Sequence, residues 1–163
     1  SLARQAAADL LGCGNPHSAN GPGEAARGRI AEARRLAAEV LLGKFADRYA
    51  CVFTSGATAS LKLVADCFPW REGSSFACVA DSHDSAWGMG EVARSHGGAV
   101  SEIALDTATL SESKRRQAKG DGAAPNLFTF PGENNVTGAK HDVRRWVEHA
   151  KRGHLGAGGG DWY

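Results

Sequence analysis

The sequence predicts an α/β fold with three layers, α/β/α, around a mainly parallel sheet. The first observation behind this prediction is that short apolar runs alternate with segments of helical periodicity from about residue 49 onward. The second is an ordinary globular composition, in which 42% of the 163 residues are hydrophobic and 23% are charged. The third is that glycine-containing polar loops follow the apolar runs, at the sheet edge where open α/β proteins bind ligands.

The N-terminal part of the chain is predicted to be mainly helical. Residues 1–11 are rich in Ala and Leu, and residues 12–18 form a loop because they contain two glycines and a proline. A long helix is expected from Glu24 to about Phe45. Its apolar residues recur at helical spacing and are expected to form one buried face: Ile30, Ala33, Ala37, Val40 and Leu41.

Strands and helices alternate in the rest of the chain. Strands are expected at residues 49–54, 76–80, 99–105 and 126–130, and helices at residues 57–68, 85–96 and 142–152. The expected inward positions of the first and last of these helices are Leu61, Val64, Ala65, Phe68, Val143, Trp146, Val147 and Ala150. The polar stretch 106–124 is expected to be a loop or a partly helical excursion, and the glycine-rich stretch 156–160 a loop. The last three residues, Asp-Trp-Tyr, are expected to open a further strand.

Charge, hydropathy and cysteine spacing argue against several classes of protein. The formal net charge of +1 argues against binding of nucleic acids or membrane surfaces through bulk charge. No apolar run reaches the length of a membrane-spanning helix. The four cysteines lack C-x-x-C spacing, which favours free, buried thiols in a reducing compartment, here the cytoplasm. No second cluster of ligand-type residues has metal-binding spacing, so no metal site is expected.

The turn Ser55-Gly56-Ala57-Thr58 lies between an apolar run and a predicted helix. The first N–H groups of a helix have no partner inside it, and the helix dipole favours an anion there. Gly56 would let a ligand approach the backbone, and Thr58 would add a hydroxyl donor. The same pattern is also typical of a simple helix cap. From the residues alone, a phosphate cradle and a cap both remain open.

Two further loops carry polar residues at the same predicted edge. In Asp81-Ser82-His83-Asp84-Ser85, His83 is a candidate general base, a metal ligand together with Asp81 or Asp84, or a flat ring that stacks on a planar ligand. The alternative is a helix cap formed by Asp84 or Ser85. In the loop 131–138, the paired asparagines indicate a turn, and an asparagine there can also donate to a ligand oxygen.

Four stretches, in this order and spacing, resemble the cysteine-desulfurase branch of the class V aminotransferase family. They are GNPHS at 14–18, VFTSGATASLKLVADCFPW at 52–70, DSHDSAWGM at 81–89 and FTFPGENNVTGAKHDV at 128–143. The resemblance covers nearly the whole chain from about residue 10. It implies the large domain of a transferase of fold type I that uses pyridoxal 5′-phosphate.

The resemblance also implies roles for particular residues. Gly56, Ala57 and Thr58 match the segment that holds the cofactor's phosphate. His83 matches the catalytic histidine that stacks on the pyridine ring, and Asn135 matches the asparagine that hydrogen-bonds the ring's phenolic oxygen. No residue matches the Schiff-base lysine, the aspartate that pairs with the pyridinium nitrogen or the persulfide cysteine. These three are expected outside residues 1–163, which would form a partial domain, inactive by itself.

The implied reaction takes sulfur from L-cysteine and leaves alanine. The stretch from 52 to 85 is most similar to members that pass this sulfur to the molybdenum cofactor, and the family commonly forms homodimers. One departure is Pro-Gly-Glu at 131–133, where the family more usually has Pro-Ala-Gln. The alternatives are another class V enzyme, such as a selenocysteine lyase or an aminotransferase-like protein, and a non-catalytic truncated paralogue.

Overall fold

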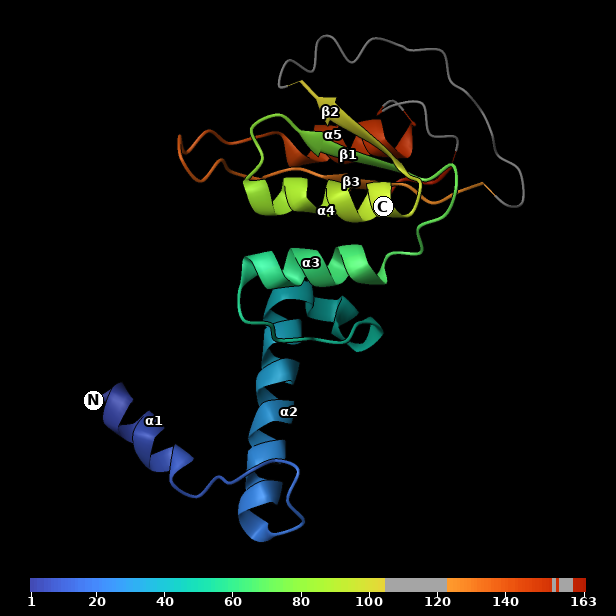
Figure 1. Cartoon of the computed structure of the whole chain (residues 1–163). Helices are drawn as coiled ribbons and strands as arrows, with labels where there is room; N and C mark the ends of the chain where they lie inside the picture. The colour runs from blue at the N-terminus through green and yellow to red at the C-terminus, as the bar shows by residue number, and fades with distance from the viewer. Residues whose placement is uncertain (105–122, 154, 156–159) are drawn as a thin grey trace. The chain divides into compact units, whose positions relative to one another are not determined.

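The chain forms two compact units, Ser1–Phe53 and Thr54–Tyr163 (Figure 1). The structure, a computed structural model, describes residues 1–104, 123–153, 155 and 160–163. Most of the predicted excursion at 106–124 and of the glycine-rich stretch at 156–160 lies outside the described residues.

The first unit is helical, as predicted. It contains α1 (Leu2–Leu10), α2 (Gly21–Leu42) and the 3₁₀ helix η1 (Gly43–Arg48). Helix α2 begins where the Asn20 side chain accepts a hydrogen bond from the Gly23 N–H at 2.9 Å. The preceding loop folds back on this turn so closely that a Cβ at Gly23 would lie 2.3 Å from the Ser18 carbonyl oxygen. Only glycine fits at this position.

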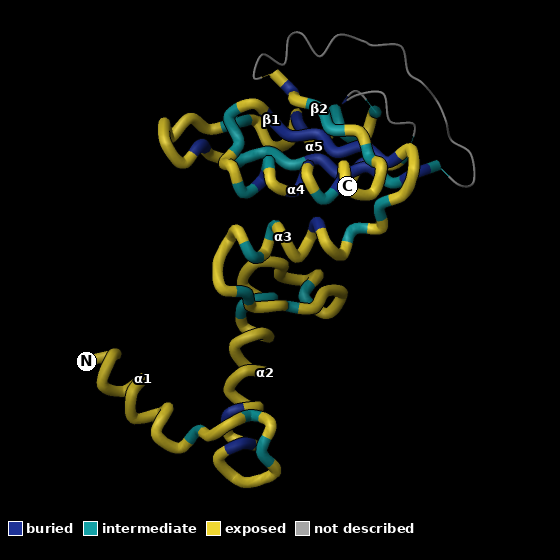
Figure 2. Tube along the Cα trace, in the orientation of Figure 1, coloured by how far each residue is buried: buried dark blue, intermediate teal, exposed yellow. Residues whose placement is uncertain are grey.

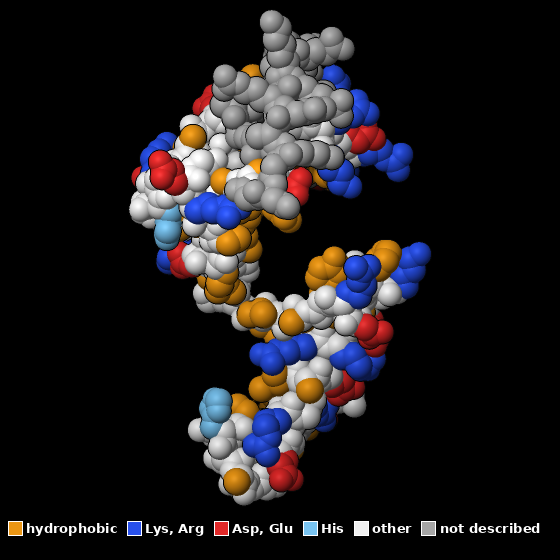
Figure 3. Space-filling view, turned by 90° about the vertical axis from the view of Figure 1, so that its right-hand side faces the viewer, with side chains coloured by type: hydrophobic (Ala, Val, Ile, Leu, Met, Phe, Trp, Pro, Cys, Tyr) orange, Lys and Arg blue, Asp and Glu red, His pale blue; other side chains and the backbone are white. Residues whose placement is uncertain are grey.

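The predicted buried face of α2 is largely exposed. Val40 is 83% exposed and Leu41 80%, and Figure 2 shows most of α1 and α2 in the colour of exposed residues. Hydrophobic side chains are accordingly visible on the surface in Figure 3. Periodicity identifies residues that share a helical face, but burial also needs an apolar partner. The described residues of this unit cover little of the face.

The predicted strand at 49–54 is wrong. These residues have no regular secondary structure, and Val52 and Phe53 are 63% and 57% exposed. A β-strand exists only where a neighbouring backbone accepts and donates its hydrogen bonds. Among the described strands, none pairs with this segment, so its apolar, β-prone residues remain irregular.

The second unit contains an all-parallel sheet in the order β2-β1-β3. Its strands are β1 (Ser75–Val79), β2 (Ala99–Ile103) and β3 (Leu127–Thr129). The segment 161–163 runs parallel beside the start of β3, since Trp162 bridges to Asn126 and the Phe128 N–H donates to the Tyr163 carbonyl at 2.9 Å. These residues therefore pair with the sheet through an isolated bridge, at the place where the sequence predicts a further strand.

Helices cover both faces of the sheet, which confirms the predicted three-layer α/β/α arrangement. They are α3 (Ala57–Cys67), α4 (Asp84–Ser95) and α5 (Val143–Lys151). One core joins α3 and α4 to the sheet face that carries Phe76 and Cys78. The other joins Trp146 of α5 to the opposite face, which carries Ala77 and Val79. Figure 1 shows α4 and α5 on either side of the strands.

Some predicted inward positions are exposed because each helix buries only a narrow stripe. Val64 of α3 and Val143 and Val147 of α5 lie outside the cores. All four cysteines are free, as predicted, but only Cys78 is buried, and Cys67 at the end of α3 is exposed. Within the described residues, no helix combines the length and apolarity needed to cross a bilayer.

Candidate functional site

Helix α3 begins at Gly56 without a side-chain cap. Gly56 adopts φ 155°, and among the described residues no side chain accepts a hydrogen bond from the first turn. The helices α4 and α5 of the same unit are both capped, by His83 and Asp142. The start of α3 therefore presents unpaired N–H groups and the positive end of the helix dipole, with open space at Gly56. An anion is the ligand that suits this arrangement.

Hydroxyl groups surround this turn in two pairs. Thr54 Oγ1 lies 2.6 Å from Ser60 Oγ, so this pair is satisfied within the turn itself. Thr58 Oγ1 lies 2.7 Å from Ser85 Oγ, which belongs to the first turn of α4. The second pair joins the starts of α3 and α4, and it brings the turn containing Thr58 to the loop containing His83.

His83 itself is the cap of α4, a role that the sequence suggested for Asp84 or Ser85. Its Nδ1 accepts a hydrogen bond from the Ser85 N–H at 3.0 Å. In the neutral imidazole, the proton is therefore on Nε2. The side chain remains exposed. Capping fixes one edge of the ring and leaves Nε2 available, so capping and ligand binding are compatible here.

Asn135 lies at the tip of a short hairpin that follows β3. Glu133 forms an antiparallel bridge with Lys140, and the Asn134 N–H donates to the Ala139 carbonyl at 2.8 Å. The Asn134 Oδ1 accepts from the N–H groups of residues 136 and 137, which fixes the turn that the paired asparagines predicted. Asn135 is exposed, and its side chain makes no hydrogen bond within the described residues.

Asp81 joins this hairpin to the loop that contains His83. The Asn134 Nδ2 donates to the Asp81 carbonyl at 2.9 Å and to its Oδ2 at 3.2 Å. His141 Nε2 lies 2.9 Å from the same Oδ2. The side chains of His141 and Asp81 are only 15% and 18% exposed, and the buried Asp81 Oδ1 has no hydrogen-bond partner in the described part of the chain. The carboxylate thus contacts both arms of the hairpin.

The structure brings the three loops that contain Thr58, His83 and Asn135 to one edge of the sheet. Thr58 and His83 are linked through Ser85, and the hairpin bearing Asn135 is linked to the His83 loop through Asp81. Sequence reasoning missed Ser85 and His141 as partners and treated Asn134 only as a turn residue. A positional signal existed, because these residues follow the ends of parallel strands or begin the next helix.

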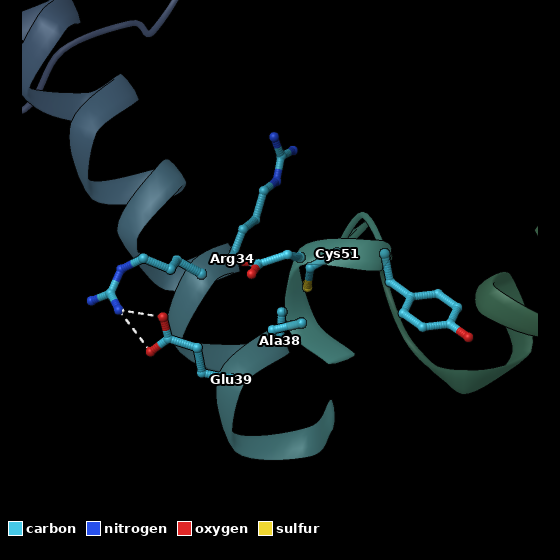
Figure 4. A pocket seen from close by; sticks show the side chains of 8 residues that line it. Arg34, Ala38, Glu39 and Cys51 are labelled. Atoms are coloured by element: carbon cyan, nitrogen blue, oxygen red, sulfur yellow. Dashed lines mark hydrogen bonds and ion pairs between the residues drawn. The ribbon is translucent and has the colours of Figure 1, made fainter. Parts of the chain in front are cut away.

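A metal site and the pocket of the first unit are two further candidates, and in the described part of the chain neither involves the predicted site residues. No group of three or more His, Cys, Asp or Glu side chains suited to a metal ion occurs among the described residues. The pocket in Figure 4 lies in the first unit and is lined in part by Arg34, Ala38 and Cys51. There Arg35 binds Glu39 at 2.7 Å. None of the predicted site residues lines this pocket.

Comparison with known proteins identifies the family. The aminotransferase class-V family model matches residues 9–157. The chain is 32% identical over 152 residues to molybdenum cofactor sulfurase of Homo sapiens, covering 87% of this chain and 17% of that protein. The enzymes of the same name from Arabidopsis thaliana and Anopheles gambiae are 32% and 40% identical, over 80% and 68% of this chain and 18% and 15% of theirs. No solved structure matches.

The match extends over both compact units of the chain, and the chain spans less than a fifth of the length of these relatives. Members of the matched family generally use pyridoxal 5′-phosphate. By the extent of this match, the chain belongs to the aminotransferase class-V family.

Proposed function

We propose that the protein containing this chain is a pyridoxal-phosphate-dependent cysteine desulfurase of the molybdenum cofactor sulfurase type. It would take sulfur from L-cysteine and deliver it to the molybdenum cofactor, as a homodimer in the cytoplasm. One observation carries the proposal: an uncapped helix start, an exposed histidine and an unpaired asparagine meet at one sheet edge. The likeness to molybdenum cofactor sulfurases over most of the chain supports the choice of reaction.

The phosphate would bind at the start of α3. The N–H groups of Ala57 and Thr58 are among those left without a cap, and Gly56 leaves space for close approach. The Thr58 hydroxyl can donate a hydrogen bond to a phosphate oxygen while accepting one from the Ser85 hydroxyl, since a hydroxyl does both. The doubly charged phosphate would thus replace the missing cap.

His83 and Asn135 would hold the ring. With Nδ1 engaged by the Ser85 N–H, the imidazole of His83 has one edge fixed and can offer its face to the pyridine ring. Its Nε2 carries the proton of the neutral imidazole and can donate a hydrogen bond to bound substrate. Asn135 has a free amide, which can donate to the phenolic oxygen of the ring.

Bound pyridoxal phosphate supplies an electron sink for cleavage of the cysteine carbon–sulfur bond. The residues of this chain would contribute binding and orientation, which fixed hydrogen bonds provide more accurately than mobile loops. They would also contribute a hydrogen-bond donor at His83 Nε2. A role in binding and orientation fits the observation that three separate loops each supply one polar group.

The test uses the full-length protein and titrates it with pyridoxal phosphate, following the absorbance of the bound cofactor. Thr58→Val should weaken binding by about tenfold, because it removes one hydrogen bond to a charged group. Ser95→Ala removes a hydroxyl at the opposite end of α4 and is expected to leave binding unchanged.

The outcomes distinguish the proposal from its alternatives. Cofactor binding followed by release of alanine from L-cysteine supports the desulfurase. Binding without that release indicates another class V enzyme, such as a selenocysteine lyase or an aminotransferase-like protein. A wild-type protein that binds no pyridoxal phosphate is a non-catalytic paralogue, and the proposal is then wrong.

A further inference from the structure

Asp81, Asn134 and His141 form a buried connection between two loops, and we refer to these three residues as the latch. The family resemblance implies no cofactor contact for any of them, and Asp81 is otherwise only a candidate metal ligand. Asn134 is buried, and the side chains of Asp81 and His141 are more than four-fifths buried. Such polar groups are costly to bury unless they are paired, so their mutual hydrogen bonds hold them in a defined geometry.

The latch contacts both arms of the hairpin at 133–140. Asn134 lies in the first arm and contacts Asp81 through Nδ2. His141 follows the second arm and contacts the same carboxylate through Nε2, while its own N–H donates to the Gly132 carbonyl at 3.1 Å. One carboxylate therefore fixes both sides of the hairpin whose tip carries Asn135.

The latch lies next to two residues of the proposed cofactor site. Asp81 precedes His83 by two residues, and Asn134 directly precedes Asn135. Both Asn135 and the His83 ring are exposed and have few constraints of their own. Their relative position depends mainly on how the two loops are joined, and the described hydrogen bonds that join them run through Asp81.

We propose that the latch is a positioning device that holds Asn135 and His83 at the separation required by one planar cofactor. This inference rests on the proposed function. The three residues do not touch the cofactor; they act through their neighbours in the chain. The Asp81 carboxylate, as an acceptor only, requires that His141 carry its proton on Nε2. Loss of that donor would leave the carboxylate with a single side-chain partner and remove the side-chain contact between Asp81 and the residue that follows the second arm.

The experiment compares His141→Leu with His141→Gln in the full-length protein. Leucine removes the donor, whereas glutamine keeps an N–H near the position of Nε2. We expect His141→Leu to weaken pyridoxal phosphate binding by about tenfold and to shift the absorption maximum of the bound cofactor. His141→Gln should keep both the affinity for pyridoxal phosphate and the absorption maximum close to those of wild type. His96→Leu removes a histidine that bonds only within the C-terminal end of α4 and serves as the control.

Hydrogen–deuterium exchange of residues 131–141, measured without cofactor, tests the latch independently. His141→Leu should speed exchange there by about tenfold relative to wild type, because opening the hairpin becomes easier. If exchange and cofactor binding both match wild type, the latch does not exist. If exchange rises while affinity and spectrum stay unchanged, the latch is purely structural and the inference is overturned. A wild-type protein that binds no cofactor overturns the proposed function and the positioning role, while exchange still reports on the latch itself.

Discussion

At the residue scale, the candidate site is built from polar side chains that each serve two neighbours. Ser85 donates its N–H to His83 and shares its hydroxyl with Thr58. Asp81 binds Asn134 through both backbone and side chain while also binding His141. Removing one such residue therefore affects two loops, which is why these positions are informative targets for mutation.

Asn126 provides a residue-scale prediction about stability. It is fully buried, and its Oδ1 accepts a hydrogen bond from the Ser75 N–H at 2.8 Å, joining the starts of β3 and β1. Asn126→Ala leaves that buried N–H without a partner and should lower the free energy of unfolding by about 1–3 kcal/mol. Chemical denaturation of the second unit, followed by tryptophan fluorescence, measures the change.

The matched control is Asn135→Ala, since that side chain is exposed and unbonded within the described residues. It should change the free energy of unfolding by less than about 0.5 kcal/mol. Equal losses in the two variants would mean that the buried hydrogen bond contributes nothing specific.

At the element scale, α5 depends on one large side chain. Trp146 is 2% exposed and lies against Phe128, with ring centroids 5.7 Å apart. Trp146→Ala should lower the free energy of unfolding by about 3–5 kcal/mol, because it removes apolar contacts and leaves a cavity. Val147→Ala, on the exposed side of the same helix, should lower the free energy of unfolding much less. Comparable losses would show that α5 does not anchor on the sheet through Trp146.

The sequence predicted the elements of the second unit well because each has a local signature. The short apolar run of β1, which is buried along its whole length, and the polar turn before α3 follow from nearby residues alone. The prediction of a strand at 49–54 was wrong because strand formation depends on a neighbouring strand that periodicity does not reveal. The apolar face of α2 was correctly located but wrongly expected to be buried, for the same reason.

The candidate site, like the fold, could be predicted only where a local pattern exists. The positions of His83 and Asn135 at one edge could be inferred, because parallel strands bring their carboxyl ends together, whereas the strand predicted before Gly56 does not form. The links between them could not, since Thr58 and Ser85 are 27 residues apart and Asp81 and His141 are 60 apart. Hydrogen bonds at such separations depend on tertiary packing, which no local pattern encodes.

At the scale of the whole molecule, the proposal assigns cofactor binding, and not the complete reaction, to the residues of this chain. The described residues include an uncapped helix start, an exposed histidine and an exposed asparagine, and the chain spans less than a fifth of the length of its curated relatives. The central claim is therefore about binding: the start of α3 is the phosphate cradle of a cofactor site. It can be tested without following the complete reaction.

The most direct measurement compares the affinities of pyridoxal phosphate and pyridoxal, which lacks the phosphate, for the full-length protein and its Thr58→Val variant. The account predicts that wild type binds pyridoxal phosphate at least about a hundredfold more tightly, since charge-assisted hydrogen bonds to the helix start contribute about 1.5–3 kcal/mol each. Thr58→Val should lower the ratio of the affinity for pyridoxal phosphate to that for pyridoxal, while the affinity for pyridoxal stays unchanged. Equal affinities of wild type for the two compounds would contradict the claim that α3 begins a phosphate cradle.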